Sequence, residues 1–394
     1  MEGSGRRVGD AVQVGDAVRV GDAVRVDGGG AAVPPPRGGS GPRFLVPTPA
    51  LDGVRALALL GTVGMHLDKQ RVPGGFVGVD VFFVLSGFLI TSLLLGEHAR
   101  TGRIDLRRFY VRRVRRLYPA LLGLLAVFVL WSLLARRTSP WEVALATAVL
   151  NALYVANWAG VAGHDVPWQV DHLWSLNVEE QFYTAVPLLL LLLLHRRVRG
   201  RALVLLLGGL ALLSTTADVA SWWRWHDPGI SYLATPLHAT GLLAGCALAV
   251  CYVHRAAEAP LTRLGRSRAV PALCVAGLLV LALTVSLDSW TGYVLGIPLA
   301  SGLALLLVAS LLLPAGGGGA GIRRLLRSRP AVAVGRRTYS LYLWQNFAQW
   351  ALTGPLHHAP VVVWVAVNVA VTAVAGELSY RFVENVLRRG HRAA

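Results

Sequence analysis

The residues best suited to chemistry in this 394-residue chain are ionisable side chains inside otherwise apolar segments. In "RALALLGTVGMH", Arg55 and His66 are separated by ten residues that are apolar or glycine, apart from one threonine. Eleven positions make about three helical turns, so both side chains share a face, roughly 16 Å apart along the axis. An imidazole in a membrane suits a general base. The alternatives are an arginine that reaches the membrane surface and a histidine that only makes an interhelical hydrogen bond.

A carboxylate occupies a similar setting in "GGFVGVDVFFVLSGFLI", where Asp80 is surrounded by valines and aromatic residues. If Asp80 pairs with His66 across a short hairpin, it fixes the imidazole tautomer and raises the basicity of the ring. The alternative is an acidic residue that interacts favourably with the N-terminus of a helix.

Four arginines lie together in "FYVRRVRRLYPAL", just before another apolar segment: Arg112, Arg113, Arg115 and Arg116. Guanidinium groups bind phosphate bidentately, so the cluster is a candidate site for a nucleotide-bearing donor on the cytoplasmic side. The alternative is a positively charged anchor that keeps this end of a span inside the cell.

Two adjacent carboxylates, Glu179 and Glu180, begin a further apolar segment in "DHLWSLNVEEQFY". Tyr183 lies four residues after Glu179 and shares its helix face. Carboxylates are costly in a membrane unless they face a cavity, so we expect them on its outer side, where they bind an acceptor hydroxyl or act as acid or base. The alternative is an interfacial aromatic belt with acidic residues at a helix start.

Membrane-spanning helices are expected to position these residues. The chain is 54% hydrophobic and 15% charged, with a mean hydropathy of +0.54, whereas soluble domains are about 25% charged. Its net charge of +17 falls in arginine runs between apolar segments, which argues against nucleic-acid binding. Its three cysteines lie in apolar segments, where we expect neither disulfides nor a metal site. We predict an all-α membrane protein with about ten spans of roughly 20 residues. The expected spans are residues 51–68, 76–96, 117–135, 178–195, 202–220, 232–253, 269–287, 292–313, 335–353 and 361–383.

The apolar stretch 142–158 is shorter and is predicted to be re-entrant or interfacial. If it does not cross, the basic regions 97–116, 195–201, 254–268, 322–337 and the C-terminal tail all lie on one side. The positive-inside rule then places both termini in the cytoplasm of a plasma-membrane protein. Arg136 and Arg137, which would lie outside, count against this topology.

Residues 1–46 differ in composition from the rest of the chain. The segment "VGDAVQVGDAVRVGDAVR" repeats a six-residue unit three times. A hexapeptide β-helix needs several stacked coils, and three hexads make about one. We therefore predict a disordered, low-complexity cytoplasmic tail over 1–46. A start codon assigned too early, so that the segment is not translated, is the alternative. The segment has no apolar region of the kind found in a signal peptide. The membrane domain is expected over 47–389 and a short tail over 390–394.

Six stretches together resemble the acyltransferase 3 family of bacterial membrane O-acyltransferases. They occur in the order of that family and cover roughly residues 51–389: "LDGVRALALLGTVGMH", "GFVGVDVFFVLSGFLIT", "FYVRRVRRLYPAL", "HLWSLNVEEQFY", "YSLYLWQ" and "LSYRFVENVLRR". The resemblance implies a ten-helix domain that moves an acyl group, often acetyl, from cytoplasmic acyl-CoA to a hydroxyl of a sugar or other acceptor. Acyl-CoA is then a co-substrate, and no permanently bound cofactor is implied.

The family's motifs map onto residues already singled out. Its arginine–ten residues–histidine motif corresponds to Arg55 and His66, and its R-x-x-R motif to Arg113 and Arg116. Its W-S-x-x-V-E-E-Q-F-Y motif corresponds to Trp174, Ser175, Glu179, Glu180, Gln181 and Tyr183.

Three features depart from the family. Gln345 replaces a common histidine and cannot titrate, while His238 and Thr240 stand where relatives often have an arginine and an acid. Many relatives continue into an SGNH-type esterase-like domain, which is not expected here. The chain would then transfer the acyl group directly or pass it to a separate transferase.

These observations lead to one main hypothesis. Acyl-CoA binds at Arg55 and the arginine cluster, and His66 acts as general base or as transient acyl carrier. Asp80, Glu179 and Glu180 assist catalysis, while Trp174, Ser175, Tyr183 and Gln345 contact the acceptor. A transporter or flippase is the competing function, and an inactive scaffold is a third. The acceptor stays open among cell-wall glycan, lipid-linked sugar, exported polysaccharide and glycosylated antibiotic.

Overall fold

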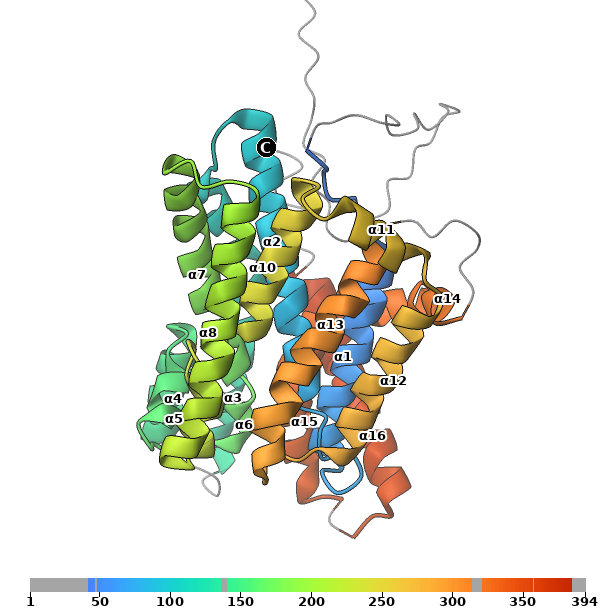
Figure 1. Ribbon diagram of the computed structural model, residues 1–394. Coiled ribbons are helices and arrows are strands. Elements are labelled where there is room, and N and C mark those ends of the chain that lie inside the picture. Colours follow the sequence, from blue (N-terminus) through green and yellow to red (C-terminus); the bar gives the residue numbers. More distant parts are fainter. Residues whose placement is uncertain (1–41, 47, 136–139, 314–320, 357, 385–394) are drawn as a thin grey trace, which may run out of the picture. The chain divides into compact units, whose positions relative to one another are not determined.

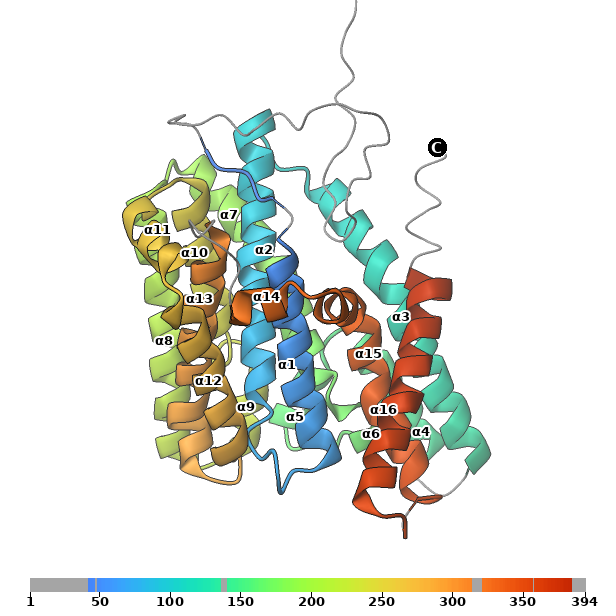
Figure 2. The same ribbon diagram turned by 90° about the vertical axis from the view of Figure 1, so that its right-hand side faces the viewer.

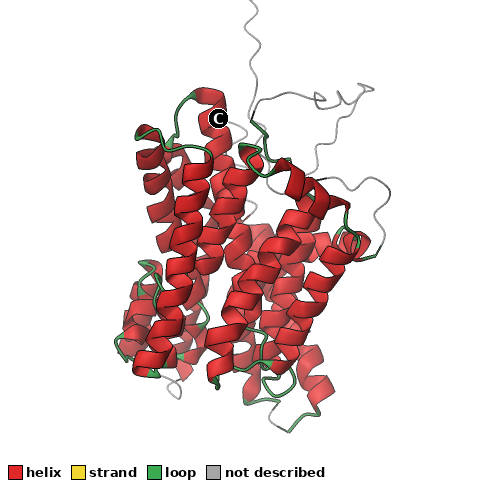
Figure 3. Ribbon diagram, viewed as in Figure 1, coloured by secondary structure: helices red, strands yellow, loops and turns green. Residues whose placement is uncertain are grey.

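The computed structural model describes residues 42–46, 48–135, 140–313, 321–356 and 358–384 (Figure 1). Within these ranges the regular secondary structure is helical, with no strand (Figure 3). The repeat at 8–25, the rest of the expected tail up to residue 41 and the tail 390–394 lie outside the described residues.

Long helices occupy the ten ranges in which spans were expected. They are α1 (Pro49–Leu67), α2 (Val77–Thr101), α3 (Leu106–Ala135), α7 (Trp174–His195), α8 (Arg201–Trp225), α10 (Thr240–Val253), α12 (Ala269–Thr284), α13 (Ile297–Leu312), α15 (Arg329–Thr353) and α16 (Val361–Leu378). Shorter elements connect or extend them: α4 (Trp141–Ala152), α5 (Ala156–Val161), α6 (Trp168–Asp171), α9 (Pro228–Leu233), α11 (Glu258–Arg266), η1 (Gly292–Gly296), α14 (Ile322–Leu326) and η2 (Ser379–Glu384).

Length and composition confirm an all-helical membrane protein, with fewer unambiguous spans than expected. Among the described residues, seven helical stretches are long and apolar enough to cross a bilayer. An eighth candidate is the pair α10 and α11, which bends by 102°. Of the other two long helices, α12 has only 16 residues. The 25 residues of α15 include three arginines and several amides and hydroxyls, which lower its hydropathy.

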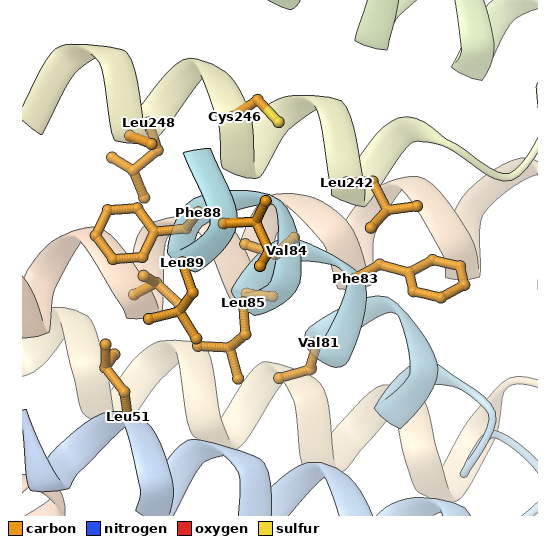
Figure 4. Close-up of a cluster of buried hydrophobic side chains, with 14 of the residues drawn as sticks. Leu51, Val81, Phe83, Val84, Leu85, Phe88, Leu89, Leu242, Cys246 and Leu248 are labelled. Atoms are coloured by element: carbon orange, nitrogen blue, oxygen red, sulfur yellow. The ribbon is translucent and has the colours of Figure 1, made fainter. Parts of the chain in front are cut away.

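The core forms around α2, which lies between α10 and α1 (Figure 4). Gly87 of α2 faces the carbonyl oxygen of Leu242, and a Cβ at that glycine would lie only 1.9 Å from this oxygen. At Gly245 of α10, an added Cβ would likewise lie only 2.2 Å from the carbonyl oxygen of Val84 in α2. Small residues at facing positions let two membrane helices approach closely, so α2 and α10 pack backbone to backbone.

The stretch 142–158 does not form a spanning helix, as predicted. Its first part is α4, whose 12 residues extend about 18 Å, short of the ~30 Å hydrocarbon core. The chain then reverses at Tyr154, which has a φ of 56°, and continues into the short α5. Figures 1 and 2 show α4, α5 and α6 together at the end of the bundle where α1 ends. We call this segment, residues 140–171, the re-entrant layer.

Residues 42–46, which were expected to belong to the tail, lie against the bundle. The backbone N–H of Arg43 donates to the carbonyl oxygen of Val253 at 2.8 Å. Its guanidinium pairs with Glu258 at 2.9 Å. The membrane unit therefore begins before α1.

Candidate active site

His66 lies in the last turn of α1 and is half-buried. Its Nδ1 lies 2.8 Å from the carbonyl oxygen of Thr62 one turn earlier. A carbonyl can only accept, so this contact requires the proton on Nδ1. The tautomer leaves the lone pair of Nε2 available, and Nε2 is the atom that a general base or an acylated nucleophile needs.

A small polar pocket lies beside His66, between α1, α15 and α16. Its volume is about 10 Å³, and its polar lining includes His66, Gln345, Gln349, Asn368 and Thr372. Gln345 is only 3% exposed, and neither its amide oxygen nor its nitrogen has a hydrogen-bond partner among the described residues. An unsatisfied buried polar group costs about 1–3 kcal/mol. A group that enters the pocket and hydrogen-bonds this amide would recover that cost.

Two polar residues near His66 escaped the sequence analysis. The Nε2 of His172 lies 3.3 Å from the carbonyl oxygen of Leu343, its Nδ1 has no described partner, and its ring is close enough to His66 to interact electrostatically. Gln349 donates its side-chain N–H to the carbonyl oxygen of His66. Because Gln349 follows Gln345 by one helical turn, the spacing in "WQNFAQ" would have pointed to it.

Asp80 does not pair with His66, so the expectation of a His66–Asp80 hairpin pair is wrong. One carboxylate oxygen of Asp80 lies 3.4 Å from Nε2 of His238 and accepts from the Ser301 hydroxyl at 3.3 Å, while the other has no partner among the described residues. The helical run of α2 from Val77 places Asp80 against α10 and α13. His238 also donates from Nδ1 to the carbonyl oxygen of Tyr232 at 2.9 Å. Both ring nitrogens thus face oxygen atoms, an arrangement that suits an imidazolium paired with a carboxylate.

The carboxylates of the "VEEQFY" motif meet the arginine cluster instead of lying apart from it. Glu180 pairs with Arg113 at 2.6 Å, and both side chains are less than one-fifth exposed. The same guanidinium lies over the Tyr183 ring, 3.4 Å from its centre. Glu180 therefore lies level with the second turn of α3. The expected separation of this carboxylate from the donor arginines is wrong, because the fold brings the first turns of α3 and α7 together.

Glu179 accepts hydrogen bonds from two hydroxyl groups, those of Ser86 and Tyr183. The bond from Tyr183 joins residues one helical turn apart, while Ser86 comes from the core helix α2. Glu179 and Glu180 thus have different partners, since one is bound by hydroxyls and the other by a cation.

The remaining cationic candidates differ in exposure. Arg112 and Arg115 are exposed on α3, whereas Arg116 lies 3.7 Å from the buried Glu384. Arg55 donates to Asp52 at 2.8 Å, and Arg336 of α15 lies 3.7 Å from the same carboxylate. Within the cluster, Arg113 and Arg116 thus lie beside carboxylates of other elements, and the side chains of Arg112 and Arg115 are exposed.

The two residues that open α7 face different partners. The Trp174 ring packs against Tyr232, with 4.3 Å between the ring centres. Ser175 lies 2.6 Å from the hydroxyl of Tyr342, which donates to the carbonyl oxygen of His172 at 2.7 Å. Ser175 is therefore part of the packing between α7 and α15, on the same side as His172.

Gln181 is the residue of the motif whose role only the structure reveals. Its amide nitrogen donates to the carbonyl oxygen of Tyr154 at 2.6 Å and to Asn157 at 2.9 Å. Its amide oxygen accepts from the Trp158 indole at 3.1 Å and from the Thr235 hydroxyl at 2.6 Å. One side chain thus joins α7 to the re-entrant layer.

Comparisons with known proteins identify the family. Residues 48–379 match the family model described as an acyltransferase domain. O-acetyltransferase OatA of Staphylococcus aureus is 33% identical over 367 residues, which are 88% of this chain and 58% of the relative. Peptidoglycan O-acetyltransferase OatA of Listeria monocytogenes is 32% identical over 357 residues, 86% of this chain and 56% of the relative. The chain thus spans little more than half the length of these relatives. No solved structure matches it. The chain belongs to the acyltransferase 3 family.

Proposed function

We propose that the chain is a membrane O-acyltransferase that moves an acyl group, acetyl in the first instance, from acyl-CoA to a hydroxyl of a carbohydrate. The observation that carries the proposal is the His66 site. Its Nε2 has a free lone pair because Nδ1 donates to Thr62. The buried amide of Gln345, which has no partner among the described residues, lines the same pocket. The names of the relatives support acetyl as the group and a glycan as the acceptor.

The reaction needs one proton acceptor that later becomes a proton donor. His66 Nε2 takes the proton from the acceptor hydroxyl, whose oxygen attacks the thioester carbonyl. The new C–O bond forms as the C–S bond breaks, and the CoA thiolate recovers the proton from Nε2. The Gln345 amide N–H lies where it can hydrogen-bond the carbonyl oxygen as negative charge develops on it.

The phosphates of the donor are proposed to bind at the arginine-rich first turns of α3. Arg112 and Arg115 are exposed and offer guanidinium forks to the phosphates of acyl-CoA. The buried Arg113–Glu180 pair instead fixes α3 against α7. The acyl arm then follows the α1 face that carries Arg55 and His66. We place the phosphate end in the cytoplasm of a plasma-membrane protein, in line with the positive-inside rule.

Replacement of His66 tests the proposal. The purified His66→Gln protein is expected to lose acetyl-CoA turnover by at least about 100-fold, the usual contribution of a general base. Its unfolding temperature in detergent should stay near that of the wild type, because glutamine keeps a polar side chain of similar reach. His195→Gln, an exposed histidine at the end of α7, is the matched control and should keep full turnover.

Two further measurements separate the remaining alternatives. Exchange of labelled CoA into acetyl-CoA without an acceptor indicates an acylated His66, and its absence indicates a general base. Uptake of a solute into vesicles without any turnover of acetyl-CoA would contradict the proposal and favour a transporter. Turnover by His66→Gln at close to the wild-type rate would also contradict it.

A further inference from the structure

A larger cavity lies apart from the His66 pocket, where the re-entrant layer meets the start of α7. Its volume is about 370 Å³, within the range of about 300–1,000 Å³ that small-molecule sites occupy. Residues of α4, α5, α6, α7 and α9 line it, together with the loop 162–167. A segment that does not cross the membrane thus contributes most of the wall of a ligand-sized space.

One side of the cavity offers a carboxylate. Asp171 lines the cavity and is exposed, although it follows the buried Val170 in α6. One of its oxygens accepts from the side chain of Asn346 at 3.1 Å. Carboxylate oxygens can accept several hydrogen bonds each, so Asp171 retains capacity for hydroxyl donors on a ligand.

An aromatic wall lies next to this carboxylate, because Trp174 follows Asp171 by three residues. Trp174 and Tyr232 both line the cavity and contact each other. His238 supports both rings from behind, with ring centres 5.3 Å from Trp174 and 5.1 Å from Tyr232. The Asp80 carboxylate in turn holds His238. This wall is therefore backed by the buried contact between His238 and Asp80, which gives Asp80 a positioning role.

The floor of the cavity is rigid. Asn157 donates to the carbonyl oxygen of Leu233 and to Thr235 at 3.0 and 3.1 Å, and it accepts from Gln181. Asn151 donates to the carbonyl oxygen of Thr147, one turn earlier in α4. A floor whose amides are already bonded does not have to reorganise when a ligand binds.

Two pairs of consecutive residues connect the cavity to the His66 pocket. On α15, Asn346 binds Asp171 while the preceding Gln345 lines the His66 pocket. At the end of α6, Asp171 lines the cavity while the next residue, His172, interacts electrostatically with His66. Neighbouring residues of α15 and of the segment between α6 and α7 thus connect a ligand bound at Asp171 to the catalytic histidine.

We infer that this cavity binds the acceptor as a single sugar ring, with Trp174 against its apolar face and Asp171 accepting from its hydroxyl groups. The inference rests on the proposed function and adds a site for its acceptor. Aromatic rings combined with a few convergent polar groups suit a ligand with apolar faces and polar edges, such as a pyranose. An acyl chain has no hydrogen-bond donor for the Asp171 carboxylate, so it would leave the remaining acceptor capacity of this group unused.

The test compares variants of the full-length chain in a strain that lacks the wild-type gene. Asp171→Asn removes the charge but keeps an oxygen that can accept from Asn346. Trp174→Ala removes the stacking surface, and Trp174→Phe restores an aromatic face. Glu142→Gln, an exposed acid in the first turn of α4, is the matched control. The readouts are ester-linked acyl groups on envelope glycans by mass spectrometry, acetyl-CoA consumption by purified protein, and the amount of folded protein in membranes.

Asp171→Asn and Trp174→Ala are expected to lower glycan acylation by at least about tenfold, whereas Trp174→Phe should recover a large part of it. Glu142→Gln should match the wild type. Glycan acylation within twofold of the wild type in Asp171→Asn would overturn the inference, even if Trp174→Ala failed to fold. An acyl group found on a lipid hydroxyl and on no glycan would also overturn it. A wild-type protein that does not consume acetyl-CoA would instead contradict the proposed function.

Discussion

At the scale of single residues, replacement of Gln345 distinguishes a catalytic role of its amide from a structural role. Because this buried amide has no partner within the described part of the chain, removing it relieves the cost of an unsatisfied polar group. We expect Gln345→Ala to lower the rate of acyl transfer about tenfold. This factor corresponds to the loss of one hydrogen bond that stabilises the transition state by roughly 1.4 kcal/mol. The unfolding temperature should stay equal or rise. The two predictions are measured by the rate of acyl transfer and by thermal unfolding of the purified protein in detergent.

Gln349→Ala provides the comparison, because Gln349 donates to the backbone of His66 and its loss should lower the unfolding temperature. A fall in stability with unchanged transfer in Gln345→Ala would mean that this amide is structural.

The sequence could identify Arg55, His66 and the two glutamates as unusual, because an ionisable residue in an apolar segment stands out by itself. The sequence could not predict which residues these side chains contact. Arg113 meets Glu180 and Asp80 meets His238 only through the packing of α3 on α7 and of α2 on α10. The pair of Asp80 with His66 seemed favourable because the two are close in the chain, whereas the fold brings in a histidine from far along it.

At the scale of elements, the re-entrant layer depends on Gln181. Its four hydrogen bonds reach Tyr154, Asn157, Trp158 and Thr235. Gln181→Leu keeps the size of the side chain but leaves these groups without their partner. At about 1–3 kcal/mol for each buried group left unsatisfied, we expect a loss of at least ~3 kcal/mol, confined to this layer. Backbone hydrogen exchange over residues 141–171 should accelerate, while α2 and α10 stay protected.

Thr184→Val is the control for this change, because the Thr184 hydroxyl bonds only to the carbonyl oxygen of Glu180 in its own helix. Equal exchange rates over 141–171 in Gln181→Leu and the wild type would mean that side-chain packing alone holds the layer.

The positions of the long helices could be predicted because their hydropathy alone marks them. The start of α7 was harder to place. Hydropathy suggested a span from residue 178, whereas the helix begins at Trp174 and its glutamates lie level with α3. The cause is the re-entrant layer, whose three short helices and turn at Tyr154 have too weak a periodicity to be resolved from the sequence.

At the scale of the whole molecule, the distribution of arginines predicts which end of the bundle faces the cytoplasm. The loops that carry Arg103 and Arg199 are basic. Few cations occur in the loops around Gln70 and His226. The stretch around Ala162 has none, apart from the two arginines at 136 and 137 that precede it. A crossing at 142–158 would reverse every later loop relative to the first two. The orientation of the later helices therefore depends on whether the re-entrant layer returns to the side on which it began.

Single cysteines in a background without Cys246, Cys251 and Cys274 test this topology. Gln70→Cys, Ala162→Cys and His226→Cys occupy exposed positions at one end, and Arg103→Cys and Arg199→Cys occupy exposed positions at the other. A maleimide that cannot cross membranes should label the first three in intact cells and the last two only after permeabilisation, because basic loops are retained inside. Labelling of Arg199→Cys in intact cells, with Arg103→Cys protected, would show that the layer crosses. The Asp171 cavity and the loops after α7 would then lie on opposite sides of the membrane from those proposed, and an acceptor outside the cell could not enter by the open loop 162–167.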